Sequence, residues 1–351
     1  MTQPYWIFMG VDRSHFSAKL RPAIRYKQFH CMEHPPDNEE IQRRTGAGFV
    51  PILISPDDET FQDTTDIIDE LEQRFPTPAL IPDDANDRSL CRLLELYGDE
   101  FFPMVSMRTR WAYEENEQEL RRAFSAFSGS AEIGNIVADK MSGYLPALGI
   151  TPDTIPVIDA HTNALLKIMD AHLEQHPFLL GDRLSLADCT LMGPLYAHLY
   201  LDRVTRKQLY DSALNVCMWI ERCNRPIPEK MGGTFEGRYP DSLNALINLI
   251  DQDAIPILSD MQDAFQSQLA DLNPEDPLPR VTGMYSSNLR GTAFSGGVRS
   301  YVIWKIQRLA ESVESLGEHH PISELPNCKK LLAREGVPEM HKQNFQLVMG
   351  Y

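Results

Sequence analysis

Residues 49–75 (FVPILISPDDETFQDTTDIIDELEQRF) combine two features that could bind a small molecule. The apolar run at their start predicts a strand, and Pro51 within it removes one hydrogen bond of the sheet, which places this strand at an edge, a bulge or a cis turn. With a cis bond before Pro51, the N–H and C=O of Val50 would point out of the sheet and could pair with an extended peptide. Asp63 is a suitable cap for a helix that begins near Thr64, and the first amides of this helix could hold a carboxylate. The segment therefore predicts backbone pairing at one end and anion binding at the other.

A second group of candidates lies at the start of the first predicted helix. Ser14 follows an aromatic strand at residues 5–10 and precedes a helix that we expect to begin at Phe16 or Ser17. Its hydroxyl can cap this helix or donate a hydrogen bond to a bound thiolate, and its position alone does not separate the two roles. Ser17 is the alternative for the second role. No cysteine occurs in this turn, so thiol–disulfide exchange cannot begin here.

A third group could contact an acceptor molecule. It lies on the first long helix of the second half of the chain and consists of Arg108, Arg110, Trp111 and Tyr113. Two arginines beside two aromatic rings favour an anionic or aromatic ligand. Ion pairs with Glu114 or Glu115 are the alternative interpretation.

At the other potentially reactive residues the sequence predicts neither a metal site nor a disulfide. The run from His30 to His34 contains metal-ligating residue types, but on a strand Cys31 and Glu33 would face away from the two histidines, so we expect no metal site. The six cysteines are scattered and lack the spacing of a disulfide framework, so we expect them to be reduced.

The elements that position these residues follow two different patterns. Residues 5–75 alternate short apolar runs and amphipathic stretches in the order β-α-β-α-β-β-α, which is the thioredoxin-like pattern. A proline-rich stretch at residues 76–87 follows, without helical periodicity. Beyond it, helical periodicity dominates in residues 89–113, 116–127, 156–173, 185–201 and 205–222.

One local motif stands out in the helical part. In FLLGDRLSLADC, Ser185 and Asp188 form a capping box with Asp in place of the usual Glu or Gln, and Leu184 can serve as its hydrophobic staple. The following helix is apolar almost all round, which predicts a buried core helix with a kink at Pro194.

These motifs resemble the glutathione S-transferase superfamily. FLLGDRLSLADC is similar to the capping-box motif of its helical domain, and VPILIS…FQDTTDII is similar to its glutathione-binding edge. The resemblance covers residues 5–225 and implies a thioredoxin-like domain at 1–78, a linker at 79–86 and an all-α transferase domain at 87–228. Residues 229–351 would be a helical extension packed on the helical domain. The apolar stripe Val302, Ile306, Leu309, Val313 and Leu316 fits this packing, and a dimer seam is its alternative role.

The resemblance also implies functional roles. Ser14 would contact the glutathione sulfur, with Ser17 as the fallback, Val50 and Pro51 would bind the peptide backbone, and Asp63 with Thr64 would hold the γ-glutamyl end. Threonine replaces the serine that the family places at position 64. Arg108 and Trp111 would face a small-molecule electrophile in the acceptor cleft.

The resemblance further implies that glutathione is a substrate or cofactor and that the protein is a homodimer. A glutathione transferase is the first hypothesis. A non-catalytic interaction protein of the same fold, or a glutathione-dependent isomerase or dehalogenase, are the alternatives.

Composition limits the partners and the cellular location that we expect for the protein. The formal charge of −17, without a basic patch in the sequence, argues against a nucleic-acid partner. No run approaches the ~20 apolar residues of a membrane span, and the first residues lack a secretory signal, so we expect a cytoplasmic protein without a membrane partner.

Overall fold

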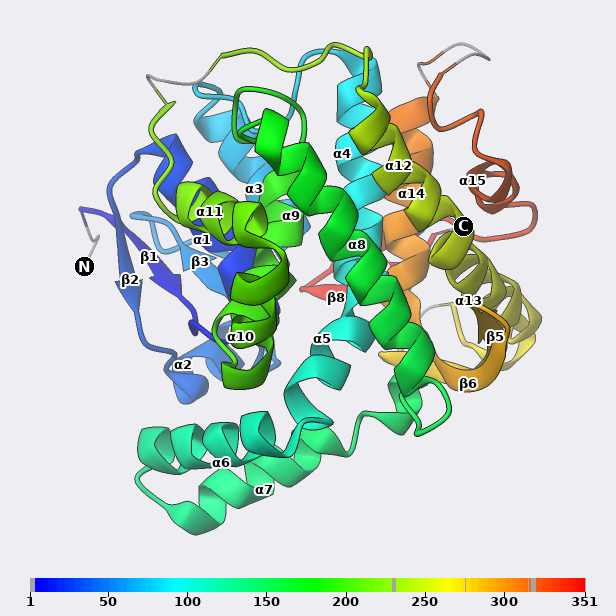
Figure 1. Ribbon diagram of the computed structural model, residues 1–351. Coiled ribbons are helices and arrows are strands. Elements are labelled where there is room, and N and C mark those ends of the chain that lie inside the picture. Colours follow the sequence, from blue (N-terminus) through cyan, green and yellow to red (C-terminus); the bar gives the residue numbers. More distant parts are fainter. Residues whose placement is uncertain (1–3, 229–231, 275, 315, 317–319, 351) are drawn as a thin grey trace.

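The computed structural model describes the whole chain except residues 1–3, 229–231, 275, 315, 317–319 and 351 (Figure 1). Its N-terminal part consists of β1 (Trp6–Met9), α1 (His15–Lys27), β2 (Cys31–His34), α2 (Asn38–Thr45), β3 (Ile52–Ile54), β4 (Thr60–Gln62) and α3 (Thr64–Arg74). The strands form one sheet in the order β2-β1-β3-β4, in which β1 and β2 are parallel and the other neighbours are antiparallel. This is the predicted thioredoxin-like arrangement. β3 begins later than predicted, at Ile52, since Pro51 has no N–H to contribute to the ladder.

An all-helical part follows. Its elements are α4 (Ala85–Leu96), η1 (Tyr97–Phe101), α5 (Phe102–Trp111), α6 (Glu114–Ser128), α7 (Ala131–Ser142), η2 (Pro146–Leu148), α8 (Ile155–Gln175), α9 (Leu186–Pro194), η3 (Leu195–Tyr200), α10 (Arg203–Ser212) and α11 (Leu214–Asn224). The predicted stretches are helical, but residues 205–222 form two helices, α10 and α11, which are separated at Ala213. The stretch at 89–113 contains the π-helical turn η1 between α4 and α5, η3 is a second π-helical turn, and α7 was not predicted. The change from α- to π-helix directly follows Pro194, where a kink was predicted.

The capping box at the start of α9 is confirmed, and it does more than cap the helix. The carboxylate of Asp188 accepts the N–H of Ser185 at 3.0 Å and its hydroxyl proton at 2.8 Å. It also accepts the N–H of Leu179 at 2.8 Å and the indole N–H of Trp219 at 2.9 Å. All residues of α9 are buried, as predicted for a core helix, and this carboxylate fixes the helix against its neighbours.

The extension contains more than the helices that the sequence predicted. Its elements are α12 (Asp241–Asp253), α13 (Ile255–Ser267), η5 (Leu269–Asp271), β5 (Val281–Leu289), β6 (Thr292–Arg299), α14 (Ser300–Val313), α15 (Pro326–Leu332), β7 (Met340–Gln343) and β8 (Gln346–Met349). Two β-hairpins, β5–β6 and β7–β8, were not predicted. The stripe residues Val302, Ile306 and Leu309 of α14 are fully buried within the chain, so the stripe is core and not a dimer seam.

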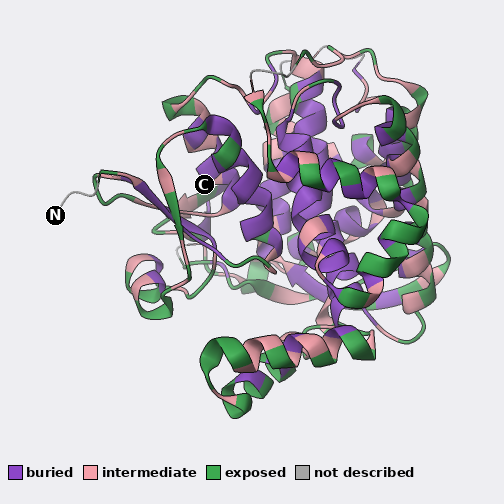
Figure 2. Ribbon diagram, turned by 60° about the vertical axis from the view of Figure 1, so that its left-hand side comes forward, coloured by how far each residue is buried: buried purple, intermediate pink, exposed green. Residues whose placement is uncertain are grey.

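One continuous apolar core joins the N-terminal sheet, the helical bundle and the extension. A smaller cluster lies on the other face of the sheet and includes Ile41 of α2. The α6–α7 hairpin projects from this body, and exposed residues cover much of it (Figures 1 and 2). Among the described residues, no helix has the length and apolar character needed to cross a bilayer.

Candidate functional site

Three of the predicted segments meet at one end of the N-terminal sheet. Met9, the last residue of β1, pairs with Ile52, the first of β3, and Ile52 pairs with Gln62, the last of β4. The residues that follow β1, precede β3 and follow β4 therefore share this end. They include the sequence-predicted site residues Ser14, Val50, Pro51, Asp63 and Thr64.

Ser14 is the N-cap of α1, and its hydroxyl keeps a proton to donate. Its Oγ accepts the N–H of Ser17 at 3.3 Å, so the capping role is present. A hydroxyl that accepts one hydrogen bond can still donate its own, so capping does not exclude contact with a ligand. Ser17 is fully buried, and its Oγ accepts the N–H of Val11 at 3.2 Å. Of the two serines, only Ser14 is partly exposed.

Two contacts with the helical domain hold the Ser14 turn in place. Arg110 donates to the carbonyl of Arg13, which precedes Ser14, at 2.7 Å and forms an ion pair with Asp202 at 2.9 Å. Gly193 in α9 allows α1 to lie directly against this helix, because a Cβ at this position would lie 2.7 Å from the carbonyl oxygen of His15. The core helix thus fixes the start of α1, and Arg110 has a positioning role that the sequence did not predict.

The other candidates on α5 lie inside the helical domain. Arg108 is 5% exposed, forms an ion pair with Asp159 at 2.8 Å and lies over the ring of Tyr113 at 4.2 Å. Trp111 is 4% exposed and packs near Phe124. The ion-pair partners are Asp159 and Asp202, not the predicted glutamates. Because the side chains of Arg108 and Trp111 are buried among neighbouring helices, we do not retain an acceptor role for them.

Val50, which precedes Pro51 and strand β3, has unpaired backbone groups. The bond between Val50 and Pro51 is cis, as the sequence suggested. No residue that the structure describes forms a hydrogen bond with the N–H or C=O of Val50, which is half-buried. These two groups are available to an extended peptide backbone.

Asp63 and the start of α3 form an acidic cap with free amides behind it. Asp63 has a φ of 75°, which is unusual for a residue with a side chain, and its carboxylate accepts the N–H of Thr65 at 2.9 Å. The N–H groups of Thr64 and Asp66 have no partner among the described residues. Although burial would raise the pKa of Asp63, the ammonium groups of Lys342, Lys305 and Lys19 lower it to about 2. Asp63 is therefore ionised at every physiological pH.

Lys342 of the extension lies against the N-terminus of α3. Nζ of Lys342, in β7, lies 3.3 Å from Oδ2 of Asp63 and 2.6 Å from Oδ2 of Asp66. It also lies 3.6 Å from the ring centre of Trp304 and 5.4 Å from that of Tyr301, both in α14. A cation is unfavourable at a helix N-terminus unless anions surround it, and here two aspartates do so. Lys342 is thus a partly exposed cation beside a carboxylate that is itself partly exposed.

A second cation of the extension contacts Phe49, the residue before Val50. The guanidinium of Arg280 stacks 3.4 Å above the ring centre of Phe49, and burial lowers the pKa of this arginine. Arg280 and Lys342 thus each contact a residue next to the sheet end, and both come from residues far along the chain.

A buried charge network joins α1, the helical domain and the extension beneath α3. Lys19 lies 2.7 Å from Glu95 and 2.6 Å from Asp99, and Lys305 of α14 also lies 2.6 Å from Asp99. Thr65 donates to Glu95 at 2.7 Å and accepts a hydrogen bond from Lys305. Burial would raise the pKa of Glu95, but Lys19, Lys305 and a nearby arginine hold it well below its usual value. All members are buried, so the network fixes α3 relative to the other two parts.

Sequence reasoning missed Lys342, Arg280 and Lys305. Lys305 had a detectable signal, since it lies three residues after Val302 and four before Leu309, on the buried side of an amphipathic helix. A lysine at such a position needs a carboxylate partner. Lys342 and Arg280 lie outside long periodic segments, and no local pattern pointed to them.

The fold and the motifs define a class of protein: a thioredoxin-like domain followed by an all-helical domain whose core helix starts with a capping box. Residues 8–79 match the family model described as glutathione S-transferase, N-terminal domain. Residues 159–226 match the model described as glutathione S-transferase, C-terminal domain. These two regions therefore belong to the glutathione S-transferase superfamily, as their motifs predicted.

Solved structures of low sequence identity are similar to parts of this chain. A glutathione S-transferase from Rhodospirillum rubrum is 20% identical, with a TM-score of 0.43 over 63% of this chain and 90% of that one. The β-etherase LigF from Sphingobium sp. is 16% identical, with a TM-score of 0.46 over 72% and 100% of the two chains. A rice glutathione S-transferase in complex with glutathione is 17% identical, with a TM-score of 0.41 over 66% and 93%. No curated protein sequence matches the chain.

Proposed function

We propose that this protein binds glutathione at the end of the N-terminal sheet and activates its thiol for attack on a small electrophile. The observation that carries the proposal is the convergence of the Ser14 hydroxyl, the unpaired backbone of Val50 and the Asp63 carboxylate at one sheet end. These groups match the three parts of the tripeptide: its sulfur, its cysteinyl backbone and its γ-glutamyl end.

The γ-glutamyl end is a zwitterion, and the site offers a partner for each of its charges. Its α-ammonium group would pair with Asp63, which stays ionised. Its α-carboxylate would accept from the free amides at the start of α3, from the Thr64 hydroxyl and from Lys342. The Asp63–Lys342 pair is thus a complementary receptor for an α-amino acid. The methyl group that Thr64 adds, compared with serine, does not remove this hydroxyl.

Ser14 would stabilise the thiolate. A hydrogen bond to a charged group contributes about 1.5–3 kcal/mol. This would lower a thiol pKa from about 8.5 to roughly 6.5–7.5. The N-terminus of α1 acts in the same direction. The thiol proton would leave to water, and the thiolate would form a carbon–sulfur bond with the electrophile as the leaving group departs with its electron pair.

Calorimetry with the full chain tests the proposal. A site with a Kd of ~1 mM, or about −4.1 kcal/mol, would be mostly filled by 5 mM glutathione. The dipeptide Cys-Gly, which lacks the γ-glutamyl group, is the matched control, and we expect it to bind at least tenfold more weakly. The absence of any glutathione binding at this concentration would refute the proposal.

We further propose that the chain forms a homodimer, and the α6–α7 hairpin is the surface that best suits a second copy. Its tip exposes Phe127, Ile133 and Ile136, which are 66%, 51% and 60% exposed. Exposed apolar side chains on one projecting hairpin are a feature of association surfaces. Light scattering should give twice the chain mass, and Ile136→Asp should reduce it to one chain. A monomeric wild type would refute the dimer.

A further inference from the structure

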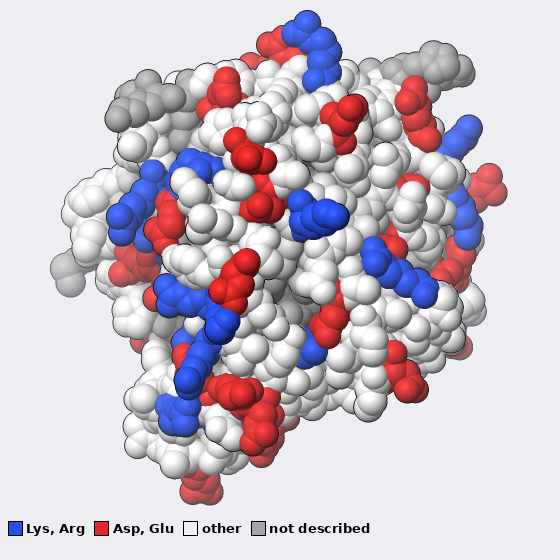
Figure 3. All heavy atoms as spheres, viewed as in Figure 1, with Lys and Arg blue, Asp and Glu red and all other residues white. Residues whose placement is uncertain are grey.

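The glycine of glutathione ends in a carboxylate that has no partner at Asp63 or Lys342, because these two residues match the charges of the γ-glutamyl end. With two carboxylates and one ammonium group, glutathione is a net anion at neutral pH. The protein itself has a formal charge of −17, and Figure 3 shows acidic side chains interspersed with the basic ones on one face. Such a protein does not attract an anion by its overall field, so the glycyl carboxylate needs a specific cation.

The pairing with Val50 determines where this carboxylate would lie. When the N–H and C=O of one residue both bond to the same partner residue, the two chains are antiparallel. If the cysteine of glutathione pairs in this way with Val50, its γ-glutamyl residue lies next to Pro51 and its glycine next to Phe49. The sheet supports this direction, because continuing the register of β3 and β4 by one residue brings Pro51 beside Asp63, the proposed γ-glutamyl partner.

The backbone of Phe49 cannot bind the glycyl carboxylate. A carboxylate accepts hydrogen bonds, and the one backbone donor of Phe49, its N–H, already donates to the carbonyl of Ala47 at 2.9 Å. The carboxylate therefore depends on a side chain near Phe49.

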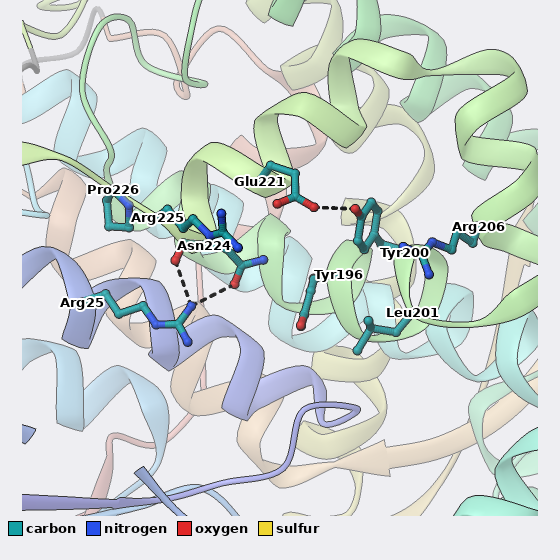
Figure 4. A pocket seen from close by; sticks show the side chains of 9 residues that line it. All are labelled: Arg25, Tyr196, Tyr200, Leu201, Arg206, Glu221, Asn224, Arg225 and Pro226. Atoms are coloured by element: carbon teal, nitrogen blue, oxygen red, sulfur yellow. Dashed lines mark hydrogen bonds between the residues drawn. The ribbon is translucent and has the colours of Figure 1, made fainter. Parts of the chain in front are cut away.

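The N-terminal domain has no cation available for this role. Among residues 4–75, every lysine and arginine except Arg25 forms an ion pair with a carboxylate. Arg44, the last cation before β3, pairs with Glu40 at 2.6 Å. Arg25 lines a separate pocket (Figure 4) and lies about 16 Å along α1 from Ser14.

Arg280 of the extension is a suitable cation. Its guanidinium lies 3.4 Å above the ring centre of Phe49, which is 43% exposed. The carboxylates of Glu100 and Asp63 attract Arg280, but no carboxylate in the part of the chain that the structure describes forms an ion pair with it. Because the flat face of the guanidinium covers the ring, its N–H groups point outward in the plane and can donate to a ligand.

We propose that Arg280 binds the glycyl carboxylate of glutathione, an inference that rests on the proposed function. The planar guanidinium matches a carboxylate in bidentate geometry, and the ring of Phe49 positions it beside the peptide edge. Together with Lys342, the extension would then supply one cation for each carboxylate of the tripeptide. The site would select tripeptide thiols with a free C-terminal carboxylate over esterified ones.

Calorimetry of the full chain with glutathione and its glycyl ethyl ester tests this inference, because the ester has no charge at the glycyl end. We expect the wild type to bind the ester at least tenfold more weakly than glutathione. Arg280→Gln should weaken glutathione binding at least tenfold and should bind the two ligands within about threefold of each other, since the carboxylate then has no cation to contact. Arg238→Gln is the matched control: this arginine of the extension has an 85% exposed side chain and lies 3.8 Å from Glu236, and its loss should leave both affinities unchanged.

Three results would overturn the inference while glutathione still binds the wild type. Equal wild-type affinities for glutathione and the ester would show that the glycyl carboxylate has no cationic partner, and this comparison needs no variant. If Arg280→Gln kept the full wild-type preference for glutathione over the ester, another residue would make the contact. If Arg280→Gln weakened both ligands equally, Arg280 would have only a structural role. In all three cases the proposed function stands, whereas no glutathione binding to the wild type at about 5 mM would refute the function and this inference together.

Discussion

Replacing Lys342 by methionine tests whether the extension takes part in glutathione binding. Nζ of Lys342 lies 2.6 Å from Asp66 and 3.3 Å from Asp63 without a ligand, and its side chain is 14% exposed. A hydrogen bond from this ammonium to the α-carboxylate would contribute about 1.5–3 kcal/mol, or about 10- to 150-fold in Kd. Because Lys342 already has aspartate partners in the free protein, the net gain falls at the lower end. We expect K342M to weaken glutathione binding about tenfold.

Calorimetry can separate this effect from general damage. Lys330→Met removes another lysine of the extension, which is 67% exposed and lies 3.6 Å from Asp263, and it should leave the Kd unchanged. A glutathione analogue without the γ-glutamyl carboxylate should bind wild type and K342M equally. Thermal unfolding should show similar stability, because the two aspartates left behind lie at a helix N-terminus, where negative charge is favourable.

An increase in affinity would refute the reasoning. If Lys342 only competes with the ligand ammonium for Asp63, its removal frees the carboxylate and glutathione binds more tightly. The extension would then close the site, which would favour a non-catalytic role for this fold. An unchanged Kd in K342M, with binding intact in the wild type, would remove Lys342 from the site and leave the proposed function standing.

Three further results follow from the site and its support. Ser14→Ala should raise the pKa of the bound glutathione thiol by about one unit or more, measured by thiolate ultraviolet absorbance, while S-methylglutathione binds as before; an unchanged pKa would leave only the helix dipole. Lys305→Met should cost about 3–5 kcal/mol in urea unfolding, because it leaves Asp99 buried with one cation fewer, whereas Lys330→Met should cost less than about 0.5 kcal/mol. Burial lowers the pKa of His15 from 6.5 to about 4, so the unfolded chain binds a proton that the folded one does not, and stability should fall by up to about 3 kcal/mol as pH drops from 6.5 to 4. His15→Asn should flatten this dependence, and an equal slope in both proteins would contradict it.

The sequence predicted those parts of the fold that local patterns determine. The order of strands and helices in residues 5–75 follows from alternating apolar runs, and the capping box at Ser185 follows from a four-residue motif. The hairpin β5–β6 was missed. Its two-residue turn, Arg290-Gly291, has positive φ at both residues, and glycine is a residue type that favours such a turn. Glycine at this turn, between strands of mixed polarity, was the available clue.

The site was predictable only where sheet geometry determines it. Val50 and Asp63 share one sheet end because a hairpin fixes their register, and this could be read from a short segment. Lys342 reaches Asp66 across 276 residues of sequence, and such a contact depends on how the whole extension folds back. The acceptor role predicted for Arg108 and Trp111 is not retained because both side chains are buried. Periodicity places the two residues on a helix, but it does not specify which neighbouring element covers each face of that helix.

The extension is part of the folding unit and not an addition to a complete transferase domain. Most residues of α4 are buried, and α14 packs along this helix. Lys305 supplies one of the two cations next to Asp99, and Arg308 forms an ion pair with Asp69 of α3 at 2.5 Å. A chain that ends at residue 228 would expose the apolar side of α4 and would leave Asp99 with Lys19 alone and Asp69 with Arg92 alone. Loss of a cation beside the buried Asp99 costs several kcal/mol.

We therefore expect the truncated chain to lose its cooperative unfolding transition and the near-ultraviolet circular dichroism of a packed core. Typical domains have only about 5–15 kcal/mol of stability, which the lost contacts would consume. A folded truncated chain that binds glutathione as tightly as the full chain would show that the helical domain is complete by itself. In that case the cations of the extension would neither support α3 nor contribute to the γ-glutamyl site.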